Sequence, residues 1–297
     1  MATAIIDIGT NTLLLLIVDD QLRPVVDVCR FGRLGAGLDA SRALSAESIA
    51  RSLAICTEYR RMLDQHQVRV PTIVGTQALR EAANAADFVD PAEKILGARI
   101  EVISGAREAE LAFLSVARTF PELAGTGYVV VDVGGGSTEV ITSDGDRIGT
   151  AVSLPIGAVR LSERHLKTDP PTAAELAALE ADIDAHLDRL ALPSGVAIIG
   201  TAGTATTLAS VALELVDYDP VAVTGVRLDP EEVETLYRRW ARLPTAKRAS
   251  IVGMEPLRAD VTVGGVAIYV RIARRIAAPM LITCDRGVRW GLAFERA

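Results

Sequence analysis

The sequence has few lysines and few aromatic residues, and each shortage restricts the fold. It has three lysines, and none of them follows a glycine. No GxxxxGK[ST] phosphate loop is therefore present, which excludes the P-loop nucleotide hydrolases. No GxGxxG follows an expected strand, which excludes the ordinary dinucleotide-binding fold. Aromatic residues make up 4% of the chain, so the core has to be built from alanine, valine, leucine and isoleucine.

Cysteine and histidine are equally scarce, with three of each. The cysteines form no CxxC pair and the histidines no HExxH pattern, so their spacing predicts neither a zinc site nor a redox dithiol. We expect buried free thiols in a reducing compartment, and histidines with structural or surface roles. These residues are Cys29, Cys56, Cys284, His66, His165 and His186.

Charge and hydropathy limit the partners of the chain. A net charge of -7 argues against a nucleic-acid polymer, which needs clustered cations. The longest apolar run near the start, residues 13–18, is too short for a membrane span or a secretory signal and has acidic residues on both sides. We expect a cytoplasmic protein that binds no membrane. Its 297 residues, 49% of them hydrophobic, suit one large domain or two smaller ones, each with a full core.

Runs rich in isoleucine, valine and leucine alternate with helical patterns, which predicts an α/β fold. Two helix starts carry capping signals, a Thr172–Glu175 capping box and an N-cap at Asp229 followed by Pro230. The expected strands are residues 4–8, 13–19, 24–29, 72–75, 99–103, 128–133 and 139–142, and the expected early helices are residues 45–66, from about 77, and 105–118.

The chain repeats itself at one fixed offset. Asp7-Ile-Gly-Thr-Asn-Thr resembles Asp132-Val-Gly-Gly-Gly-Ser, 125 residues later (132 - 7), and Ile73-Val-Gly-Thr resembles Ile198-Ile-Gly-Thr at the same offset (198 - 73). Two matches in one register predict a duplicated domain, because the period is far longer than a solenoid repeat. Each copy runs from an apolar strand through an acid and a glycine turn into a second strand, which predicts a β-hairpin.

These turns have the composition of a phosphate site. Glycine lets the backbone approach a ligand closely, so that successive N–H groups point at one anion, and the neighbouring threonines and serine add hydroxyl donors. An aspartate at the same place would repel phosphate unless a cation lay between them, and magnesium binds carboxylate and phosphate oxygens together. The alternative, an ordinary hairpin turn that uses Asp and Gly for its geometry, explains one such turn better than a duplicated pair.

Together these residues resemble the exopolyphosphatase and guanosine pentaphosphate phosphohydrolase family, within the actin-like superfamily of sugar kinases and heat-shock chaperones. The resemblance covers nearly the whole chain and is to the short, two-domain form of the family. The resembling stretches are DIGTNT (7–12), GTQALR (75–80), ISGAREA (103–109), DVGGGSTE (132–139), PIGAVR (155–160), GTAGT (200–204), PLRAD (256–260) and DRGVR (285–289).

The resemblance implies two duplicated, actin-like (ribonuclease H-like) α/β domains, each with a mixed sheet flanked by helices. It places the active site in the cleft between them. We expect the first domain at residues 1–116, with the last helix, residues 288–297, packed onto it. The second domain is expected at residues 117–284.

The resemblance also implies a catalytic base, Glu108, near the start of a helix capped by Ser104. Members of the family commonly read Glu-Glu-Ala-Arg here, whereas this chain reads Arg107-Glu108-Ala109-Glu110, which keeps an Arg/Glu pair at i, i+3. Thr10 and Thr12 stand where the family has serines. The residues expected to bind phosphate are Gly9, Thr10, Asn11, Thr12, Arg80, Gly134, Gly135, Gly136, Ser137, Thr138, Gly203 and Arg258, and those expected to bind Mg²⁺ are Asp7, Asp132 and Glu139.

The implied reaction is Mg²⁺-dependent hydrolysis of the terminal phosphate of inorganic polyphosphate, which releases orthophosphate. Removal of the 5′ phosphate from guanosine pentaphosphate is the nearest alternative, and the sequence does not separate the two. Two other classes stay open: an actin-like kinase that uses ATP, and a nucleotide-dependent scaffold or filament. The sequence also leaves open the preferred polyphosphate length, regulation, and whether the chain forms a homodimer.

Overall fold

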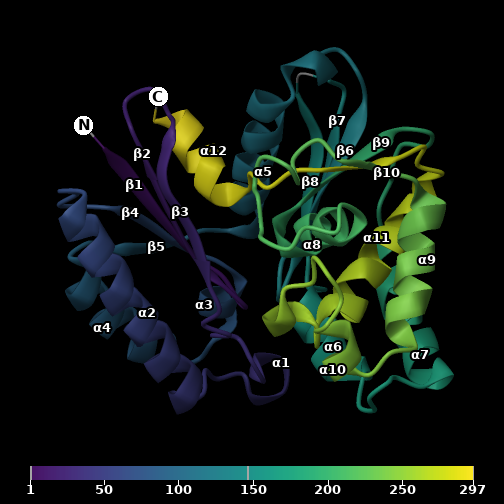
Figure 1. Ribbon diagram of the computed structural model, residues 1–297, viewed down its shortest axis with the longest axis horizontal. Coiled ribbons are helices and arrows are strands. Elements are labelled where there is room, and N and C mark those ends of the chain that lie inside the picture. Colours follow the sequence, from purple (N-terminus) through teal and green to yellow (C-terminus); the bar gives the residue numbers. More distant parts are fainter. Residues whose placement is uncertain (1, 146, 297) are drawn as a thin grey trace. The chain divides into compact units, whose positions relative to one another are not determined.

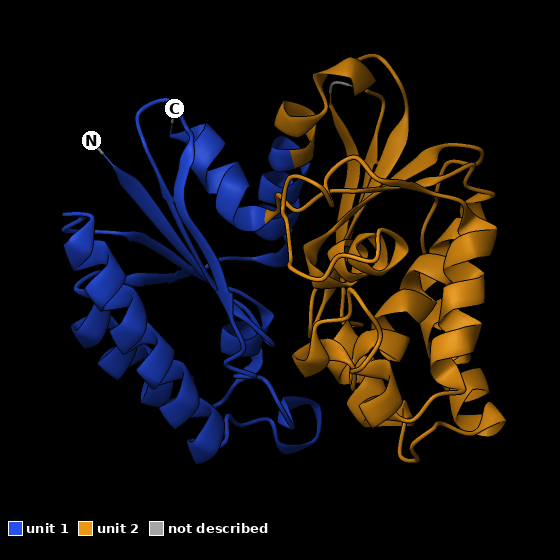
Figure 2. Ribbon diagram, in the orientation of Figure 1, with its two compact units in different colours: residues 1–115, 288–297 blue, residues 116–287 orange. Residues whose placement is uncertain are grey.

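The structure is a computed structural model that describes residues 2–145 and 147–296. It divides into two compact units, unit 1 with residues 1–115 and 288–297, and unit 2 with residues 116–287 (Figure 2). The predicted domains, residues 1–116 with the helix at 288–297 and residues 117–284, stay predictions. No helix among the described residues is both long enough and apolar enough to cross a membrane.

Unit 1 contains one mixed five-stranded sheet in the order β3-β2-β1-β4-β5. Strands β1 and β2 form an antiparallel hairpin, and β1 pairs with β4 in parallel. The elements are β1 (Thr3–Ile8), β2 (Leu13–Val18), β3 (Pro24–Arg30), α1 (Leu38–Ser41), α2 (Ala46–Gln65), β4 (Thr72–Gly75), α3 (Gln77–Glu81), α4 (Ala86–Leu96), β5 (Ile100–Val102), α5 (Gly105–Thr119, which runs on into unit 2) and α12 (Val288–Glu295).

Helices cover both faces of this sheet, and the alternation of side chains along β1 decides what each face carries. Ile6 packs with Tyr59 of α2 in one apolar core. Ile5 points to the other face and packs with Leu111 of α5 and with residues of α12. Asp7 therefore lies on the face that α5 and α12 cover, two residues beyond Ile5.

The helix expected from about residue 77 is present as α3, which begins at Gln77 and ends after five residues. Ala82 has extended dihedral angles, φ -70° and ψ 121°, and ends α3. The side-chain amide of Asn84 accepts from the N–H of Leu44 at 2.8 Å and donates to its carbonyl at 3.1 Å. Asn84 thus bonds to another segment where a helix would have continued, and α4 starts only at Ala86.

Unit 2 contains a mixed six-stranded sheet in the order β10-β11-β9-β6-β7-β8 (Figure 1). Here β6 and β7 form the antiparallel hairpin, and β6 pairs with β9 in parallel. The elements are η1 (Pro121–Leu123), β6 (Tyr128–Val133), β7 (Thr138–Ser143), β8 (Ile148–Leu154), α6 (Ala158–His165), α7 (Ala173–Leu187), β9 (Ala197–Thr201), α8 (Ala202–Ala212), β10 (Arg227–Leu228), α9 (Pro230–Ala241), α10 (Thr245–Arg248), η2 (Pro256–Arg258), α11 (Thr262–Ile276) and β11 (Leu281–Thr283).

The two sheets repeat one another at the offset found in the sequence. Strands β1 and β2 cover residues 3–8 and 13–18, and β6 and β7 cover residues 128–133 and 138–143, so both strands recur after 125 residues (128 - 3 and 138 - 13). Both sheets join an antiparallel three-stranded meander to a parallel strand on the other side of its first strand. The predicted duplication is confirmed.

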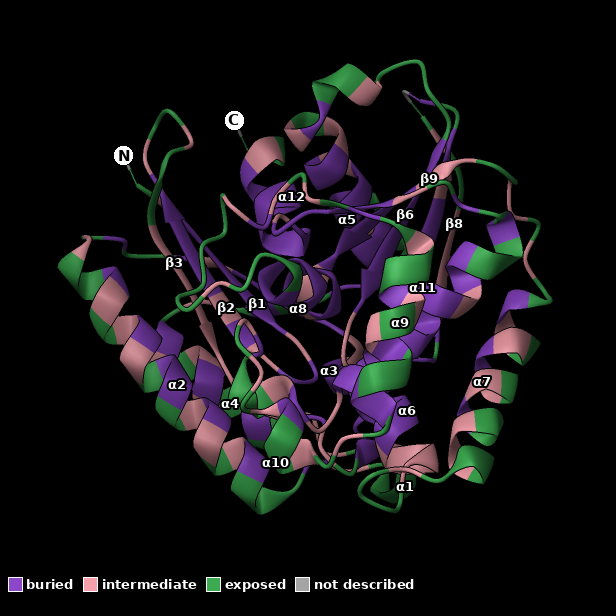
Figure 3. Ribbon diagram, turned by 45° about the vertical axis from the view of Figure 1, so that its right-hand side comes forward, coloured by how far each residue is buried: buried purple, intermediate pink, exposed green. Residues whose placement is uncertain are grey.

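The main core of unit 2 lies on one face of its sheet. Val131 and Val133 pack with Tyr269 of α11 and with residues of α7, α8 and α9. Buried residues gather in the strands and along the inner sides of these helices (Figure 3). Because side chains alternate along a strand, Asp132 and Glu139 point away from this core to the opposite face. The capping box at the start of α7 and the Asp229 N-cap of α9 are both present as predicted.

Candidate active site

The two predicted glycine turns have the same backbone geometry. The N–H of Gly9 donates to the carbonyl of Thr12 at 2.9 Å, and the N–H of Gly134 donates to the carbonyl of Ser137 at 3.0 Å. A Cβ added to either glycine would lie 3.1 Å from that carbonyl oxygen. Both turns are therefore closed too tightly for a larger residue to enter without a shift of the backbone.

The residues opposite the two aspartates differ. Asp7 pairs across the ladder with Leu14, whereas Asp132 pairs with Glu139. Directly opposite residues of an antiparallel pair have side chains on the same face, so the carboxylates of Asp132 and Glu139 are neighbours. Asp132 is 6% exposed and Glu139 1%. Like charges directly opposite one another in such a pair are destabilising, and a cation bound by both carboxylates would offset this repulsion.

A magnesium ion fits this pair better than a metal that needs a full set of protein ligands. Within residues 2–145 and 147–296, no group of three or more His, Cys, Asp or Glu side chains is arranged to hold a metal ion. Magnesium commonly takes one or two carboxylates and completes its shell with water and phosphate oxygens. Asp132 and Glu139 suit such an ion. Asp7 belongs to the other unit, and its part in metal binding stays a prediction.

Polar side chains at the turns are buried. Thr10 and Asn11 are 7% and 8% exposed, and Ser137 is 3% exposed. Over the described part of the chain, these three side chains have no hydrogen bond to another protein group, which leaves them suited to an anionic ligand. The hydroxyl of Thr138 instead donates to the carbonyl of Ile156 at 2.7 Å, so the structure gives Thr138 a structural hydrogen bond.

Each turn is held by the segment that follows the third strand of its meander. In unit 1 the N–H of Gly35 donates to the carbonyl of Thr10 at 2.9 Å, and in unit 2 the N–H of Ala158 donates to that of Gly134 at 2.9 Å. A Cβ on Gly35 would lie 2.5 Å from the γ-methyl of Thr10. The methyl that distinguishes Thr10 from serine therefore packs against a glycine.

Glu108 lies near the start of α5, as expected. The N–H of Arg107 donates to the hydroxyl of Ser104 at 3.2 Å, which confirms Ser104 as a capping residue. The predicted i, i+3 ion pair is also present, with Nη1 of Arg107 3.2 Å from Oε2 of Glu110. Glu108 itself is 8% exposed. Its carboxylate is therefore held in a largely buried place, near the helix end that favours negative charge.

Arg80 is in contact with Glu108. Nη1 of Arg80 donates to Oε2 of Glu108 at 2.7 Å and to the carbonyl of Ile103 at 2.8 Å, and Nε donates to Oε1 of Gln77 at 3.1 Å. A guanidinium group has five N–H donors, and Nη2 also donates to Gln77. A bidentate contact with phosphate would have to replace one of these bonds. Phosphate binding by Arg80 stays a prediction, and the geometry favours a role in orienting Glu108.

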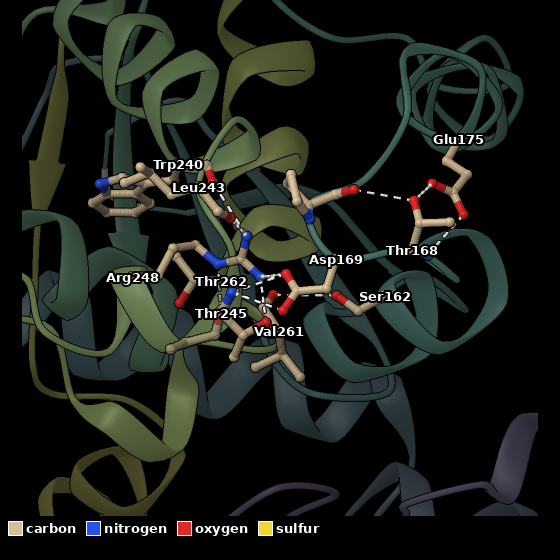
Figure 4. A network of polar contacts seen from close by, with 12 residues as sticks. Ser162, Thr168, Asp169, Glu175, Trp240, Leu243, Thr245, Arg248, Val261 and Thr262 are labelled. Carbon is tan, nitrogen blue, oxygen red and sulfur yellow. Dashed lines mark hydrogen bonds and ion pairs between the residues drawn. The ribbon is translucent and has the colours of Figure 1, made fainter.

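Gly203 and Arg258 are brought together in unit 2. A Cβ on residue 203 would lie 1.4 Å from Nη1 of Arg258, so only glycine leaves room for this guanidinium at the start of α8. The segment that carries Arg258 is fixed by Arg248, which is 3% exposed. Figure 4 shows the Arg248 guanidinium beside Trp240, Leu243 and Thr245. Nε of Arg248 donates to the carbonyl of Ala259 at 2.8 Å, and Nη1 donates to that of Trp240 at 3.2 Å.

Two polar clusters were missed by the sequence analysis. The hydroxyl of Ser153 in β8 donates to Oε1 of Glu139 at 2.7 Å, and only the pairing of β7 with β8 reveals it. In unit 2, His165 and Arg164 each lie 2.8 Å from Oδ2 of Asp182. Burial raises the pKa of Asp182, but the hydrogen bonds from His165 and Arg164 outweigh it and lower the pKa below its ordinary value.

The cysteine prediction is confirmed in part. All three cysteines are free, and Cys56 and Cys284 are buried, whereas Cys29 is only half-buried. Burial raises the pKa of both the Cys56 and the Cys284 thiols to about 12. These two thiols are therefore protonated and unreactive at neutral pH.

Comparisons with known proteins agree with the resemblance drawn from the motifs. A model of the Ppx/GppA phosphatase family matches residues 16–297. The chain is 34% identical to "Exopolyphosphatase 2" of Mycobacterium tuberculosis, over 99% of this chain and 98% of that protein. It is 29% identical to "Guanosine-5'-triphosphate,3'-diphosphate pyrophosphatase" of Vibrio cholerae, over 98% of this chain and 58% of that protein.

A solved structure supports the same assignment. The crystal structure of the Aquifex aeolicus member of the Ppx/GppA family aligns with a TM-score of 0.82 at 30% identity, and covers 100% of this chain and 97% of that one. The chain therefore belongs to the Ppx/GppA phosphatase family. The predicted fold class, two actin-like α/β domains with mixed sheets flanked by helices, is confirmed.

Proposed function

We propose that this protein is an exopolyphosphatase, a phosphoanhydride hydrolase that removes the terminal phosphate of inorganic polyphosphate as orthophosphate. The observation that carries the proposal is the buried pairing of Asp132 with Glu139 beside the glycine turn of unit 2. A divalent cation at this pair, next to backbone N–H and hydroxyl donors, suits a chain of phosphoryl groups. The 34% identity to an exopolyphosphatase over almost the full length of both proteins supports this substrate.

In the proposed reaction, Glu108 accepts a proton from the attacking water. The water oxygen forms a bond to the terminal phosphorus, the bridging P–O bond breaks, and the shortened polyphosphate leaves with the bond electrons. Arg80 orients the Glu108 carboxylate through its 2.7 Å contact, so that this oxygen atom stays in one position. The glycine turns, with Thr10, Asn11 and Ser137, would hold phosphoryl oxygens through N–H, amide and hydroxyl donors.

Magnesium, when bound by Asp132 and Glu139, would neutralise charge on the phosphoryl oxygens. The hydroxyl of Ser153 occupies one lone pair of Glu139 and so limits how this carboxylate can turn. The proposal needs residues of both units, Glu108 from unit 1 and the carboxylate pair from unit 2, to act on one substrate. The predicted cleft between the domains, the cytoplasmic location and the oligomeric state stay predictions.

Guanosine pentaphosphate is the second candidate substrate. The 29% identity to a guanosine-5'-triphosphate,3'-diphosphate pyrophosphatase favours it, since that likeness also runs along 98% of this chain. Both substrates end in a phosphoanhydride and would use the same base and the same cation.

A phosphate-release screen tests the proposal. The wild-type protein is incubated with Mg²⁺ and with polyphosphates of several lengths or guanosine pentaphosphate, and EDTA and Glu108→Gln serve as controls. We expect orthophosphate from polyphosphate at the highest rate, none above background with EDTA, and a rate lower by roughly 10²–10⁴-fold in Glu108→Gln. If phosphate is released from guanosine pentaphosphate and not from polyphosphate, guanosine pentaphosphate becomes the proposed substrate. Transfer of phosphate from ATP to a small acceptor, or nucleotide-dependent sedimentation without hydrolysis, would contradict the proposal.

A further inference from the structure

A buried hydroxyl lies where two strands of unit 2 separate. Strands β6 and β9 pair in parallel as far as Asp132 and Thr201. Beyond this point β6 enters the glycine turn and β9 enters α8. Tyr269 of α11, which is 1% exposed, donates a hydrogen bond to the carbonyl of Val131 at 2.9 Å and to that of Thr201 at 3.0 Å.

These two carbonyls belong to the peptide groups that lead into the site. The carbonyl of Val131 is in the peptide bonded to Asp132, and that of Thr201 is in the peptide bonded to Ala202, the first residue of α8. Ala202 has a φ of 61°, in the left-handed region that residues other than glycine seldom adopt. A phenol has one proton, so the two carbonyls share it. The hydroxyl therefore ties both peptides together at the last pair of the ladder, Asp132 and Thr201.

The surroundings of Tyr269 are specific to unit 2. A Cβ on Gly200 would lie 3.0 Å from the hydroxyl oxygen of Tyr269, so the glycine leaves the space that this side chain uses. The matching glycine of unit 1, Gly75, faces Leu79, which has no hydroxyl. Burial, and secondarily the charge of Asp132, raise the pKa of Tyr269 well above its ordinary value. Its hydroxyl therefore keeps its proton and stays a donor.

We propose that Tyr269 is a positioning residue that fixes the backbone of Asp132 opposite Glu139 and thereby sets the affinity of this carboxylate pair for a divalent cation. The proposal rests on the metal site assigned under the proposed function. Tyr269 acts from the face of the sheet opposite the carboxylates, through the peptide group of Asp132, and touches neither substrate nor cation.

The test measures Mn²⁺ binding to the full-length protein by electron paramagnetic resonance, with no substrate present. Tyr269→Phe removes only the hydroxyl, and we expect the Mn²⁺ dissociation constant to rise about tenfold, as for other residues that support metal ligands. Tyr237→Phe is the matched control. Tyr237 is also buried and lies in unit 2, but its hydroxyl donates to Glu180 of α7 at 2.9 Å. This control should bind Mn²⁺ as tightly as the wild type.

Gly200→Ala is a second variant, in which the added methyl group displaces the Tyr269 hydroxyl without removing it. This variant tests the proposal if Tyr269→Phe does not fold. It too should weaken Mn²⁺ binding. Unchanged binding in a folded Tyr269→Phe, or an equal loss in Tyr237→Phe, would overturn the proposal. Mn²⁺ binding that Asp132→Asn leaves unchanged would overturn it together with the metal site. The proposed function is tested by a separate measurement: it fails if the wild-type protein releases no phosphate from polyphosphate.

Discussion

The hairpin of unit 1 and the hairpin of unit 2 share a backbone and differ in chemistry. Both begin with a strand whose last residue but one is an aspartate, and both close with a hydrogen bond from a glycine N–H to the carbonyl three residues on, at 2.9 and 3.0 Å. The strand that returns from the turn carries Leu14 in one hairpin and Glu139 in the other. One residue per copy therefore separates a turn with a single acid from a turn with a carboxylate pair.

We propose that the duplicated fold divides the work of one reaction between its two copies. Unit 1 offers a carboxylate held by an arginine, Glu108 with Arg80, which suits a proton acceptor. Unit 2 offers two adjacent carboxylates, Asp132 and Glu139, directly opposite one another in the ladder, which suits a metal ion.

The largest effect is expected in unit 1. Glu108→Gln removes the proton acceptor and keeps the shape of the side chain, so turnover should fall by roughly 10²–10⁴-fold while phosphate binding is largely kept. Steady-state phosphate release gives kcat, and the affinity for polyphosphate is measured separately. Near-normal turnover would remove Glu108 from its proposed role.

A substitution in unit 2 should alter the demand for metal. Glu139→Leu gives the second hairpin the residue pair of the first, and Asp132→Asn neutralises the other member of the pair. Both should raise the Mg²⁺ concentration for half-maximal activity by about tenfold or more. A Mg²⁺ titration of phosphate release measures this change. An unchanged titration in both variants would show that the pair does not bind the cation.

The converse substitution should make unit 1 less stable. Leu14→Glu places a second carboxylate opposite Asp7, and like charges across a ladder should lower the free energy of unfolding by roughly 0.2–1 kcal/mol. Added Mg²⁺ should recover part of this loss if two opposed carboxylates are enough to bind the ion. Urea unfolding with and without Mg²⁺ measures both effects. An unaltered unfolding curve would mean that the two positions are not neighbours.

The turn hydroxyl of unit 2 should affect substrate binding. Ser137→Ala removes a donor with no partner among the described side chains, and a hydrogen bond to a charged oxygen contributes about 1.5 kcal/mol, so KM should rise roughly tenfold. Thr142→Val is the control and should keep the wild-type KM, because Thr142 lies in β7 beyond the turn, with its hydroxyl 3.1 Å from that of Thr150. Equal KM values in both variants would place the phosphate elsewhere.

The smallest effect is the acid sensitivity of unit 2. The pKa of Asp182 is lowered in the folded state, because hydrogen bonds from His165 and Arg164 outweigh its burial. Its contribution to stability is therefore complete above its ordinary value of 3.8 and is lost as the pH falls below it. In Asp182→Asn this carboxylate is absent, so the stability should fall less steeply as the pH is lowered. Melting temperatures measured from pH 6 down to pH 3 check it, and parallel curves for both proteins would contradict it.

Much of this fold follows from the sequence because its signals are local. Alternating apolar runs and glycine turns predicted the two hairpins, and one offset predicted that the second repeats the first. The break between α3 and α4 was not predicted, because it depends on the bonds of Asn84 to Leu44, 40 residues away. Local propensity contains no information about such a partner.

In the candidate site, too, some residues could be predicted from the sequence, whereas the contacts between them could not. The acids of the turns stand out because they interrupt apolar strands, and Glu108 stands out through a family motif. The contacts that orient them join residues far apart in sequence, such as Arg80 with Glu108 and Ser153 with Glu139. The family motif singled out Arg80 as a phosphate-binding candidate, but its contact with Glu108 is revealed only by the fold, as is that of Ser153 with Glu139.

Anomalous diffraction from a crystal of the Glu108→Gln variant grown with Mn²⁺ and a short polyphosphate tests the central claim most directly. We predict one manganese peak roughly 2.1–2.2 Å from carboxylate oxygens of both Asp132 and Glu139, with phosphate oxygens completing its shell. A peak that is bound by neither carboxylate, with the polyphosphate distant from the Gly134–Ser137 turn, would contradict it.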